Sequence, residues 1–374
     1  MEISLSSSEK SFFQKIDWTF VVLILCLHGL GLINLYSATH CPLDRAVNGL
    51  FLNQMIWLGA GWLFFFALTV FDYSIVNRVA YLVYFINIIA LLYVTFYGKV
   101  ALGAQRWIDL GSFHYQPSET MKLAIVVVMA KQLSRYSVHG RGLGFRQLAM
   151  PAVLLLIPFA LVVEQPDLGT AMMLTAIAVS MVIFCKVKKS IILGALIAVI
   201  IALPVAWKYV LHDYQRNRIL TFLSPNNDPR GTGYNSIQSR IAVGSGQFFG
   251  KGYQNGTQSQ LEFLPERHTD FIFSVLSEEW GFVGSVLTIG LFCALFYSIV
   301  RIASGARDKF GALLCVGVLC YIFWHMFVNI GMVIGLLPIV GVPLPLVSYG
   351  GSSMLTTMTG LGLISSIAYR RYIF

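Results

Sequence analysis

The chain has 374 residues, of which 57% are hydrophobic and 11% are charged, and its formal net charge is +9. Soluble globular domains average about 45–50% apolar and about 25% charged residues, so a water-soluble domain of this length could not bury so much apolar surface. The composition also excludes a disordered chain, a collagen-like repeat and a small secreted scaffold held by disulfides. A polytopic membrane protein remains.

Ten apolar stretches are long enough to cross a hydrocarbon core as helices, which takes about 20 residues each. In chain order they cover residues 18–38, 50–71, 75–97, 117–135, 147–163, 167–186, 188–210, 271–301, 309–337 and 347–369. The fourth is the most polar and needs neighbouring helices to cover its charged residues. The sequence therefore predicts an all-α membrane protein, with residues 1–17 as a cytoplasmic segment and 18–374 as one membrane domain.

The distribution of Lys and Arg predicts the orientation, because positive residues in short loops stay on the cytoplasmic side. With the N-terminus inside, the short outer loops carry only Arg45, Lys99 and Arg106, and far more positive residues fall on the inner side. Topology thus explains most of the positive charge. A nucleic-acid partner is not needed to account for it.

A long polar segment, about residues 211–270, separates the seventh and eighth predicted spans and lies on the outer side. Such a segment is usually functional in a protein whose other loops are short. Within it, NSIQSRIAVGSGQFFG predicts a short amphipathic helix along the membrane surface. A second outer segment, 335–353, has three prolines and four glycines. No regular helix survives that density, so we expect this segment to border a polar cavity.

Ionisable side chains at membrane depth are costly, so each indicates either function or a structural ion pair. Glu119 and Lys122 are three residues apart and share a helix face. One interpretation is a buried ion pair that holds the fourth span. The other is that Lys122 faces an anionic headgroup with Glu119 as its orienting partner, and the two are compatible. Asp167, in the short outer turn EQPDLGT, either caps the sixth span or contacts a cation or sugar.

The densest polar group is LPERHTDFIF (264–273), where Glu266, Arg267, His268 and Asp270 precede a long apolar helix. Asp270 suits the start of that helix without any further role. Alternatively, a carboxylate at the floor of an outer cavity, beside two phenylalanines, would have a raised pKa and act as a general base. His268 and Asp270 alone are too few ligands to predict a metal site.

Several motifs together resemble those of the SEDS family (shape, elongation, division and sporulation). They are QRWIDLG, QPSETMK, EQPDLGT, GTQSQLEFLPERHTDFIF and PLPLVSYGGSS. The resemblance covers nearly the whole chain, and the short N-terminus and the stretch before LPE are most similar to the elongation members. It implies a GT-C-like SEDS fold in the bacterial cytoplasmic (inner) membrane, with both termini in the cytoplasm and the active site facing the periplasm.

The resemblance implies a peptidoglycan glycosyltransferase that polymerises lipid II into β-1,4-linked strands with inversion. This displacement needs a base on the attacking hydroxyl and positive charge near the departing pyrophosphate. By motif, Asp270 is the base. The residues implied in substrate binding are Arg106, Lys122, Arg216 and Arg218 for pyrophosphate, Gln238, Ser239, Ser348, Ser352 and Ser353 for sugar or peptide, Gly350 and Gly351 for close approach, and Glu119, Asp167, Glu266 and His268 around them.

The resemblance also implies a class B penicillin-binding protein as partner and a lateral opening for the lipid. A divalent cation, Mg²⁺ or Mn²⁺, is left open, because Arg and Lys can do its work at the pyrophosphate. Two rival functions are a transporter that flips lipid II and a scaffold without catalysis. The charged motifs gather on the outer half, whereas a flippase needs a polar path through both leaflets, so the polymerase is favoured.

Overall fold

The computed structural model describes residues 15–40, 48–101, 104–109, 111, 114–136, 142–210, 213–224, 232–261 and 263–371, and this part of the chain is mostly helical. Most of the predicted cytoplasmic segment 1–17 lies outside these residues. Long apolar stretches fold as helices because a helix satisfies its own backbone hydrogen bonds where no water is present.

A helix coincides with each of the ten predicted spans. In chain order these are α2 (Trp18–Thr39), α3 (Asn48–Val70), α4 (Tyr73–Tyr97), α5 (Pro117–Ser134), α6 (Phe145–Glu164), α7 (Leu168–Phe184), α8 (Lys189–Val205), α12 (Ile272–Ser304), α13 (Lys309–Val333) and α14 (Gly351–Arg370). Among the described residues, seven helices are long and apolar enough to cross a membrane, namely α2, α3, α4, α6, α8 with its extension, α12 and α13. That all ten cross it remains a prediction.

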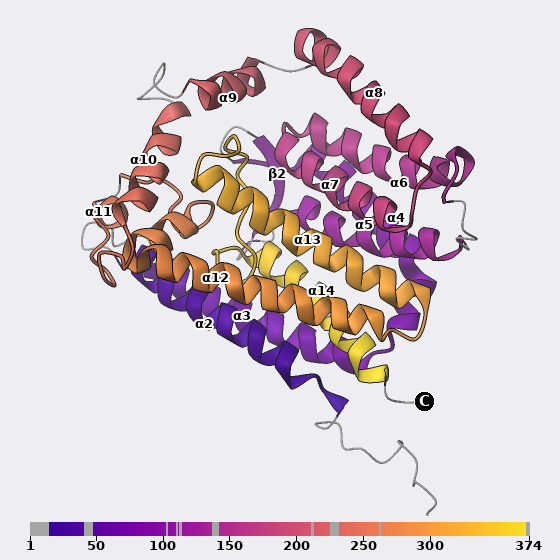
Figure 1. Ribbon diagram of the computed structural model, residues 1–374, viewed down its shortest axis with the longest axis horizontal. Coiled ribbons are helices and arrows are strands. Elements are labelled where there is room, and N and C mark those ends of the chain that lie inside the picture. The colour runs from indigo at the N-terminus through magenta and orange to yellow at the C-terminus, as the bar shows by residue number, and fades with distance from the viewer. Residues whose placement is uncertain are drawn as a thin grey trace, which may run out of the picture.

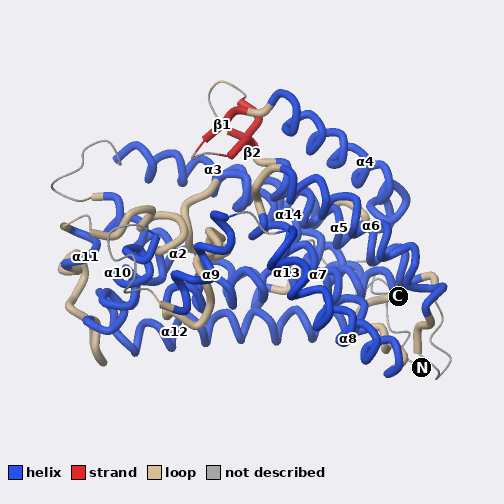
Figure 2. The backbone as a smooth tube through the Cα atoms, turned by 90° about the horizontal axis from the view of Figure 1, so that it is seen from above, coloured by secondary structure: helices blue, strands red, loops and turns tan. Residues whose placement is uncertain are grey.

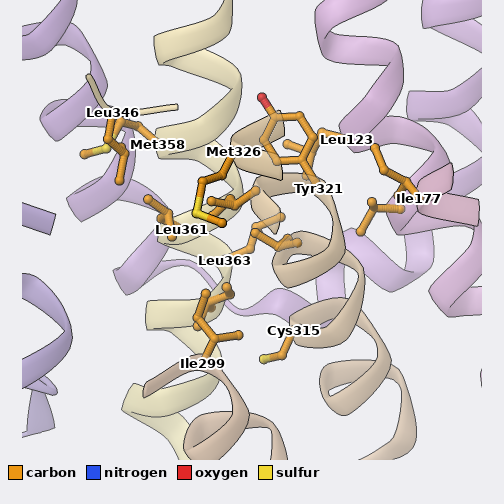
Figure 3. Packing of buried hydrophobic residues seen from close by; sticks show 14 of the residues in the cluster. Leu123, Ile177, Ile299, Cys315, Tyr321, Met326, Leu346, Met358, Leu361 and Leu363 are labelled. Carbon is orange, nitrogen blue, oxygen red and sulfur yellow. The ribbon is translucent and has the colours of Figure 1, made fainter. Parts of the chain in front are cut away.

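The helices α5 and α14 are less apolar than the others, and both are enclosed by protein. Almost every side chain of α5 is buried, and α5 packs against α4, α13, α7 and α6. Figure 3 shows the contact at the centre of the bundle, where Leu123, Tyr321, Met326 and Leu361 meet. Gly317 permits this approach, because a Cβ atom there would lie 2.5 Å from the Val126 side chain. A helix that faces protein rather than lipid does not need an apolar surface all round.

Aspartate side chains begin several of these helices by accepting a hydrogen bond from a backbone N–H in the first turn. These N-caps are Asp17 on α2, Asp72 on α4, Asp167 on α7 and Asp308 on α13. For Asp167 the structure confirms the helix-cap interpretation. The bounds of these helices are therefore set by local chemistry that the sequence displays.

Loops predicted on the same side of the membrane contact one another. Arg301, after the eighth predicted span, pairs with Asp17 at 2.5 Å, and both lie on the predicted inner side. Arg106 lies 3.7 Å from Asp167, and both lie on the predicted outer side. In Figure 1, α10 and α11 gather at one end of α12 and the C-terminus lies toward the other. This segregation supports the predicted alternation of the spans.

The helix α8 stands apart from the packed bundle. It runs along one edge of the molecule in Figure 1, and none of its described side chains is buried. A short π-helical turn, Ala206–Val210, extends it toward the predicted outer segment. That segment contains α9 (Asp213–Leu223), α10 (Thr232–Ser245) and α11 (Thr257–Gln260), of which only the region of α10 is predicted as a helix.

A small antiparallel sheet departs from the predicted all-α class. Its strands β1 (Lys99–Ala101), β2 (Ala104–Asp109) and β3 (His114–Tyr115) pair in chain order, and Figure 2 shows the sheet at the edge of the helical body. Residues 334–350, between α13 and α14, have no regular helix or strand, as their prolines and glycines predict. The predicted ninth span, which ends at 337, and the predicted tenth span, which begins at 347, therefore both extend too far into this segment.

A break in α12 is closed by a neighbouring loop. Gly281 has φ 66° and ψ −157°, which interrupts the helix and leaves backbone groups without their usual partners. The loop before α11 supplies them: Lys251 N donates to the Glu278 carbonyl at 3.0 Å, and Phe282 N donates to the Gln247 carbonyl at 2.9 Å. Gly250 is required there, because a Cβ atom would lie 2.1 Å from the Glu279 carbonyl oxygen. Backbone pairing thus joins the outer segment to α12.

Candidate active site

Asp270 lies in the loop that immediately precedes α12, and neighbouring segments hold the backbone of this loop. Ser348 Oγ donates to the Thr269 carbonyl at 2.7 Å, and Tyr349 N donates to the His268 carbonyl at 2.9 Å. From α13, Asn329 Nδ2 donates to the carbonyl of Asp270 itself at 2.8 Å. The irregular segment 334–350 and α13 therefore fix the position of Asp270.

The carboxyl group of Asp270 has an environment suited to proton transfer. The residue is partly exposed. Burial raises the pKa of Asp270 to about 7, the negative charges of Glu266 and Glu119 raise it as well, and Arg218 opposes them. A carboxyl group that titrates near the working pH both accepts and releases a proton readily, as a general base must.

The segment 334–350 forms one wall of the site. A Cβ atom on Gly341, whose φ is 78°, would lie 3.3 Å from Asp270 Oδ2. Val340 in turn packs against the start of α7, where Gly169 leaves room for its side chain. The wall is therefore built close to the carboxyl group from backbone and small residues.

Arg218 stands on α9 beside a small cavity that is open to solvent. The cavity is lined by Arg218, Thr221, Phe222, Ser236, Pro338 and Ile339. Its last two residues belong to the segment that borders Asp270, and Arg218 acts electrostatically on the Asp270 carboxyl. The cavity, a guanidinium group and the candidate base thus share one region. Arg216, two residues earlier, donates to the Lys208 carbonyl at 3.0 Å.

Two cations predicted to bind substrate make contacts within the protein, and their binding role stays a prediction. Lys122 is 1% exposed, and its Nζ lies 2.7 Å from Glu119 Oε1 and 2.7 Å from His325 Nε2. His325 Nδ1 lies 2.8 Å from the Tyr321 carbonyl, so it carries the proton and Nε2 is left to accept from Lys122. The structure thus shows the buried ion pair of Glu119 and Lys122, and the headgroup role of Lys122 stays a prediction.

Arg106 is the second of these cations, and it joins β2 to the turn between α6 and α7. Its guanidinium group donates to the carbonyls of Gln165 and Pro166 and lies 3.7 Å from Asp167 Oδ2. The side chain is partly buried. These contacts give Arg106 and Asp167 a structural role at the outer end of the bundle.

The predicted hydroxyl and glycine positions mostly serve the packing of the outer end. Ser239 Oγ donates to the Val333 carbonyl at 3.2 Å, and Ser352 Oγ accepts from Gln116 N at 3.2 Å. Ser353 is buried, Gly350 N donates to Gln54 Oε1 at 3.3 Å, and Gly351 packs on Trp57. Of the rest, Gln238 is half-buried on α10, and His268 Nε2 lies 3.8 Å from Glu266 Oε2 near Asp270.

Sequence reasoning missed a row of polar residues on α13. Tyr321, His325 and Asn329 are four residues apart, so they share one face of the helix, and all three are fully buried. They contact Thr357, Lys122 and the Asp270 backbone respectively. The available signal was the presence of a His and an Asn inside an apolar span, which is costly and therefore informative.

The described residues include no group of three or more His, Cys, Asp or Glu side chains that could hold a metal ion. The side chains around Asp270 thus do not form a protein cage for a divalent cation.

The chain is similar to known proteins along nearly its whole length. The family model described as "Cell cycle protein", covering FtsW, RodA and SpoVE, matches residues 17–373. The peptidoglycan glycosyltransferase MrdB of Escherichia coli is 39% identical over 97% of this chain and 97% of its own length. Stage V sporulation protein E of Bacillus subtilis is 34% identical over 95% of this chain and 98% of its own.

Solved structures agree with this assignment. The rod shape determining protein RodA of Thermus thermophilus is 30% identical, with a TM-score of 0.70 over 96% of this chain and 98% of that one. A chain from a structure titled as the coordination of polymerization and crosslinking by a peptidoglycan synthase complex is 31% identical, with a TM-score of 0.81 over the same shares. The SEDS resemblance is confirmed, and the chain belongs to the FtsW, RodA and SpoVE family of membrane proteins.

Proposed function

We propose that this protein is a peptidoglycan glycosyltransferase of cell elongation that joins lipid II units into β-1,4-linked glycan strands. The observation that carries the proposal is Asp270, a partly exposed carboxyl group with a pKa near 7 that lies against Gly341 and within the electrostatic reach of Arg218. The names of the relatives support it, because both MrdB of Escherichia coli and RodA of Treponema pallidum are named peptidoglycan glycosyltransferases.

The proposed reaction is a single displacement. The 4-hydroxyl oxygen of the acceptor N-acetylglucosamine attacks the anomeric carbon of the lipid-linked donor, and the Asp270 carboxylate takes the hydroxyl proton. The bond from the anomeric carbon to the pyrophosphate oxygen breaks, and its electron pair leaves with undecaprenyl pyrophosphate. Because the donor is α-linked, one displacement gives a β-linked product, which is inversion.

Positive charge at the departing pyrophosphate completes the proposed site. Guanidinium groups match phosphate oxygens well, and Arg218 stands at the mouth of the cavity near Asp270. We assign this role first to Arg218, with Arg216 on the same helix as a second candidate. Lys122 and Arg106 are engaged elsewhere, so their proposed contribution is to hold the outer end of the bundle in shape.

The substrate tail and the surroundings of the protein fit a membrane enzyme. The apolar, exposed α8 leads directly through residues 206–210 toward α9 and Arg218, so we propose that the undecaprenyl chain stays in lipid beside α8. The proposed location is the bacterial inner membrane, with both termini inside and Asp270 facing the periplasm. A class B penicillin-binding protein is the proposed partner, in line with the synthase complex among the similar structures.

The test uses purified protein and lipid II in detergent, with and without a class B penicillin-binding protein, and reads glycan chains on a gel. Wild-type protein should polymerise lipid II, and Asp270→Asn should not. Asp109→Asn, an exposed carboxylate on the outer sheet paired with Lys99, is the matched control and should remain active. Equal polymer from Asp270→Asn would exclude the base assignment. Translocation of lipid II in vesicles without any polymer would favour the rival flippase.

A further inference from the structure

One nitrogen atom on α13 joins the two backbone segments that flank the Asp270 carboxyl group. Asn329 Nδ2 donates one hydrogen to the Asp270 carbonyl at 2.8 Å and the other to the Val342 carbonyl at 2.7 Å. Val342 follows Gly341, where a Cβ atom would lie 3.3 Å from Asp270 Oδ2. The same amide therefore sets the spacing between the base and its wall.

The chemistry of the contact explains why the residue is an asparagine. Two carbonyl oxygens demand two donors, and the side-chain amide supplies both from one atom. An aspartate of the same shape would present oxygen to both carbonyls and repel them. Asn329 is fully buried, and its own Oδ1 has no hydrogen-bond partner among the described residues. An arrangement that leaves a buried oxygen unpaired is costly, which is expected where position matters more than stability.

We propose that Asn329 is a positioning residue for the general base, which acts by holding the Asp270 backbone against residues 341–342. This inference rests on the proposed function for its catalytic meaning. Loss of the two hydrogen bonds lets the wall separate from the carboxyl group and admits water. Asp270 then leaves the position in which it accepts the hydroxyl proton, and it loses the burial that favours its protonated form.

Asn34 provides a matched control, because it holds the backbone two residues after Asp270. It is a buried asparagine on α2, its Nδ2 donates to the Ile272 carbonyl at 2.9 Å, and its Oδ1 also has no partner among the residues described. It thus holds the first residue of α12, whereas Asn329 bridges Asp270 and Val342. A merely structural role would make the two asparagines equivalent.

The first measurement follows the Asp270 carboxyl group without relying on polymerisation. Dicyclohexylcarbodiimide reacts with protonated carboxyl groups in apolar surroundings, so labelling of Asp270 against pH, read by peptide mass spectrometry, reports its titration. The charged groups acting on it are Glu266 in its own loop, Arg218 on α9 and Glu119 on α5, and all three stay unchanged. We expect the midpoint in Asn329→Leu to fall by about one pH unit or more, and that in Asn34→Leu to stay.

The second measurement is lipid II polymerisation by the same full-length variants in detergent. We expect kcat in Asn329→Leu to fall about 100-fold with KM little changed, as misplacement of a catalytic group predicts. Asn329→Ser keeps one donor and should fall between wild type and Asn329→Leu in both measurements, and it replaces the leucine variant if that fails to fold.

The two measurements separate the two proposals. If wild-type protein makes no polymer, the proposed function fails, while the labelling midpoint still decides whether Asn329 controls the carboxyl group. If the midpoint is the same in wild type, Asn329→Ser and Asn329→Leu, or if Asn34→Leu shifts it equally, Asn329 is only a structural residue and the inference is wrong.

Discussion

Asp270 and Glu278 are eight residues apart on one segment, and their surroundings assign them opposite roles. The Glu278 side chain is fully buried, and its Oε1 accepts from Lys251 Nζ at 2.7 Å, Thr257 Oγ1 at 3.1 Å and Gln258 N at 3.0 Å. Asp270 is partly exposed, and the hydrogen bond from Asn329 reaches its backbone rather than its carboxyl group. A carboxylate whose one oxygen accepts from three donors anchors structure, whereas one with a raised pKa is available for chemistry.

The largest expected effect is on the polymerisation rate of Asp270→Asn, with no loss of stability. We expect Asp270→Asn to lower the polymerisation rate about 10²- to 10⁴-fold, because a general base contributes that much. Its thermal unfolding midpoint at pH 8 should not fall. The pKa of Asp270 is higher in the folded than in the unfolded state, so its contribution to stability is fully present below the unfolded-state pKa. That contribution is lost as the pH rises through about 7. At pH 8 an uncharged amide at this position therefore costs no stability. A large loss of stability in this variant would make Asp270 an anchor like Glu278.

The opposite result is expected at Glu278. Glu278→Ala removes one partner of a buried ion pair, and we expect it to lower the free energy of unfolding by about 3 kcal/mol. Thermal unfolding in detergent measures the effect, and activity per folded molecule should change little. Glu278→Gln keeps an acceptor for Thr257 and Gln258 and should lose less. Loss of activity at unchanged stability would contradict the anchoring role.

The pH dependence of wild-type protein is the third way to test the contrast. The base must be ionised, so the polymerisation rate should fall about tenfold for each pH unit below 7 and level off above it. Initial rates between pH 5 and pH 9 give the profile. A rate that holds constant down to pH 5 would mean that the carboxylate in use has an ordinary pKa and is not Asp270.

The smallest expected shift in the pH profile concerns Arg218, whose loss should also slow the reaction because of its proposed role at the pyrophosphate. Its charge lowers the pKa of Asp270 against the effects of burial and Glu266. We expect Arg218→Gln to move the acid limb of the pH profile upward by about half a unit, since an exposed charge is partly screened. Arg216→Gln is the control and should shift the limb less.

The sequence predicts the helical stretches and Asp270 because both depend on local composition. A run of apolar residues folds as a helix wherever it meets lipid or protein, and a carboxylate beside phenylalanines before a long helix is visible in ten consecutive letters. The N-cap role of Asp167 is also local, since its partner Thr170 is three residues away. These are the parts of the fold and the site that were predictable.

The partners of the buried ions were not predictable, because they are distant in sequence. His325 meets Lys122 across 203 positions, and Asn329 meets Asp270 across 59. The substrate-binding role predicted for Lys122 therefore competes with a contact that no local pattern reveals. The three-stranded sheet was missed for another reason, since strands of two to six residues carry too short a pattern to distinguish from a loop.

The backbone pairing that joins the outer segment to α12 at Gly281, called the joint, has a practical consequence for fluorescent labelling. Peptide groups make part of the joint, so its geometry depends on Gly250 and Gly281 as well as on the Glu278 side chain. The adjacent turn, Tyr253, Gln254 and Asn255, is exposed and lies between two anchored positions. A fluorophore attached at Asn255 would be held at a fixed position on the protein. Its energy transfer to a tagged substrate would then report the distance between the two dyes rather than motion of the loop.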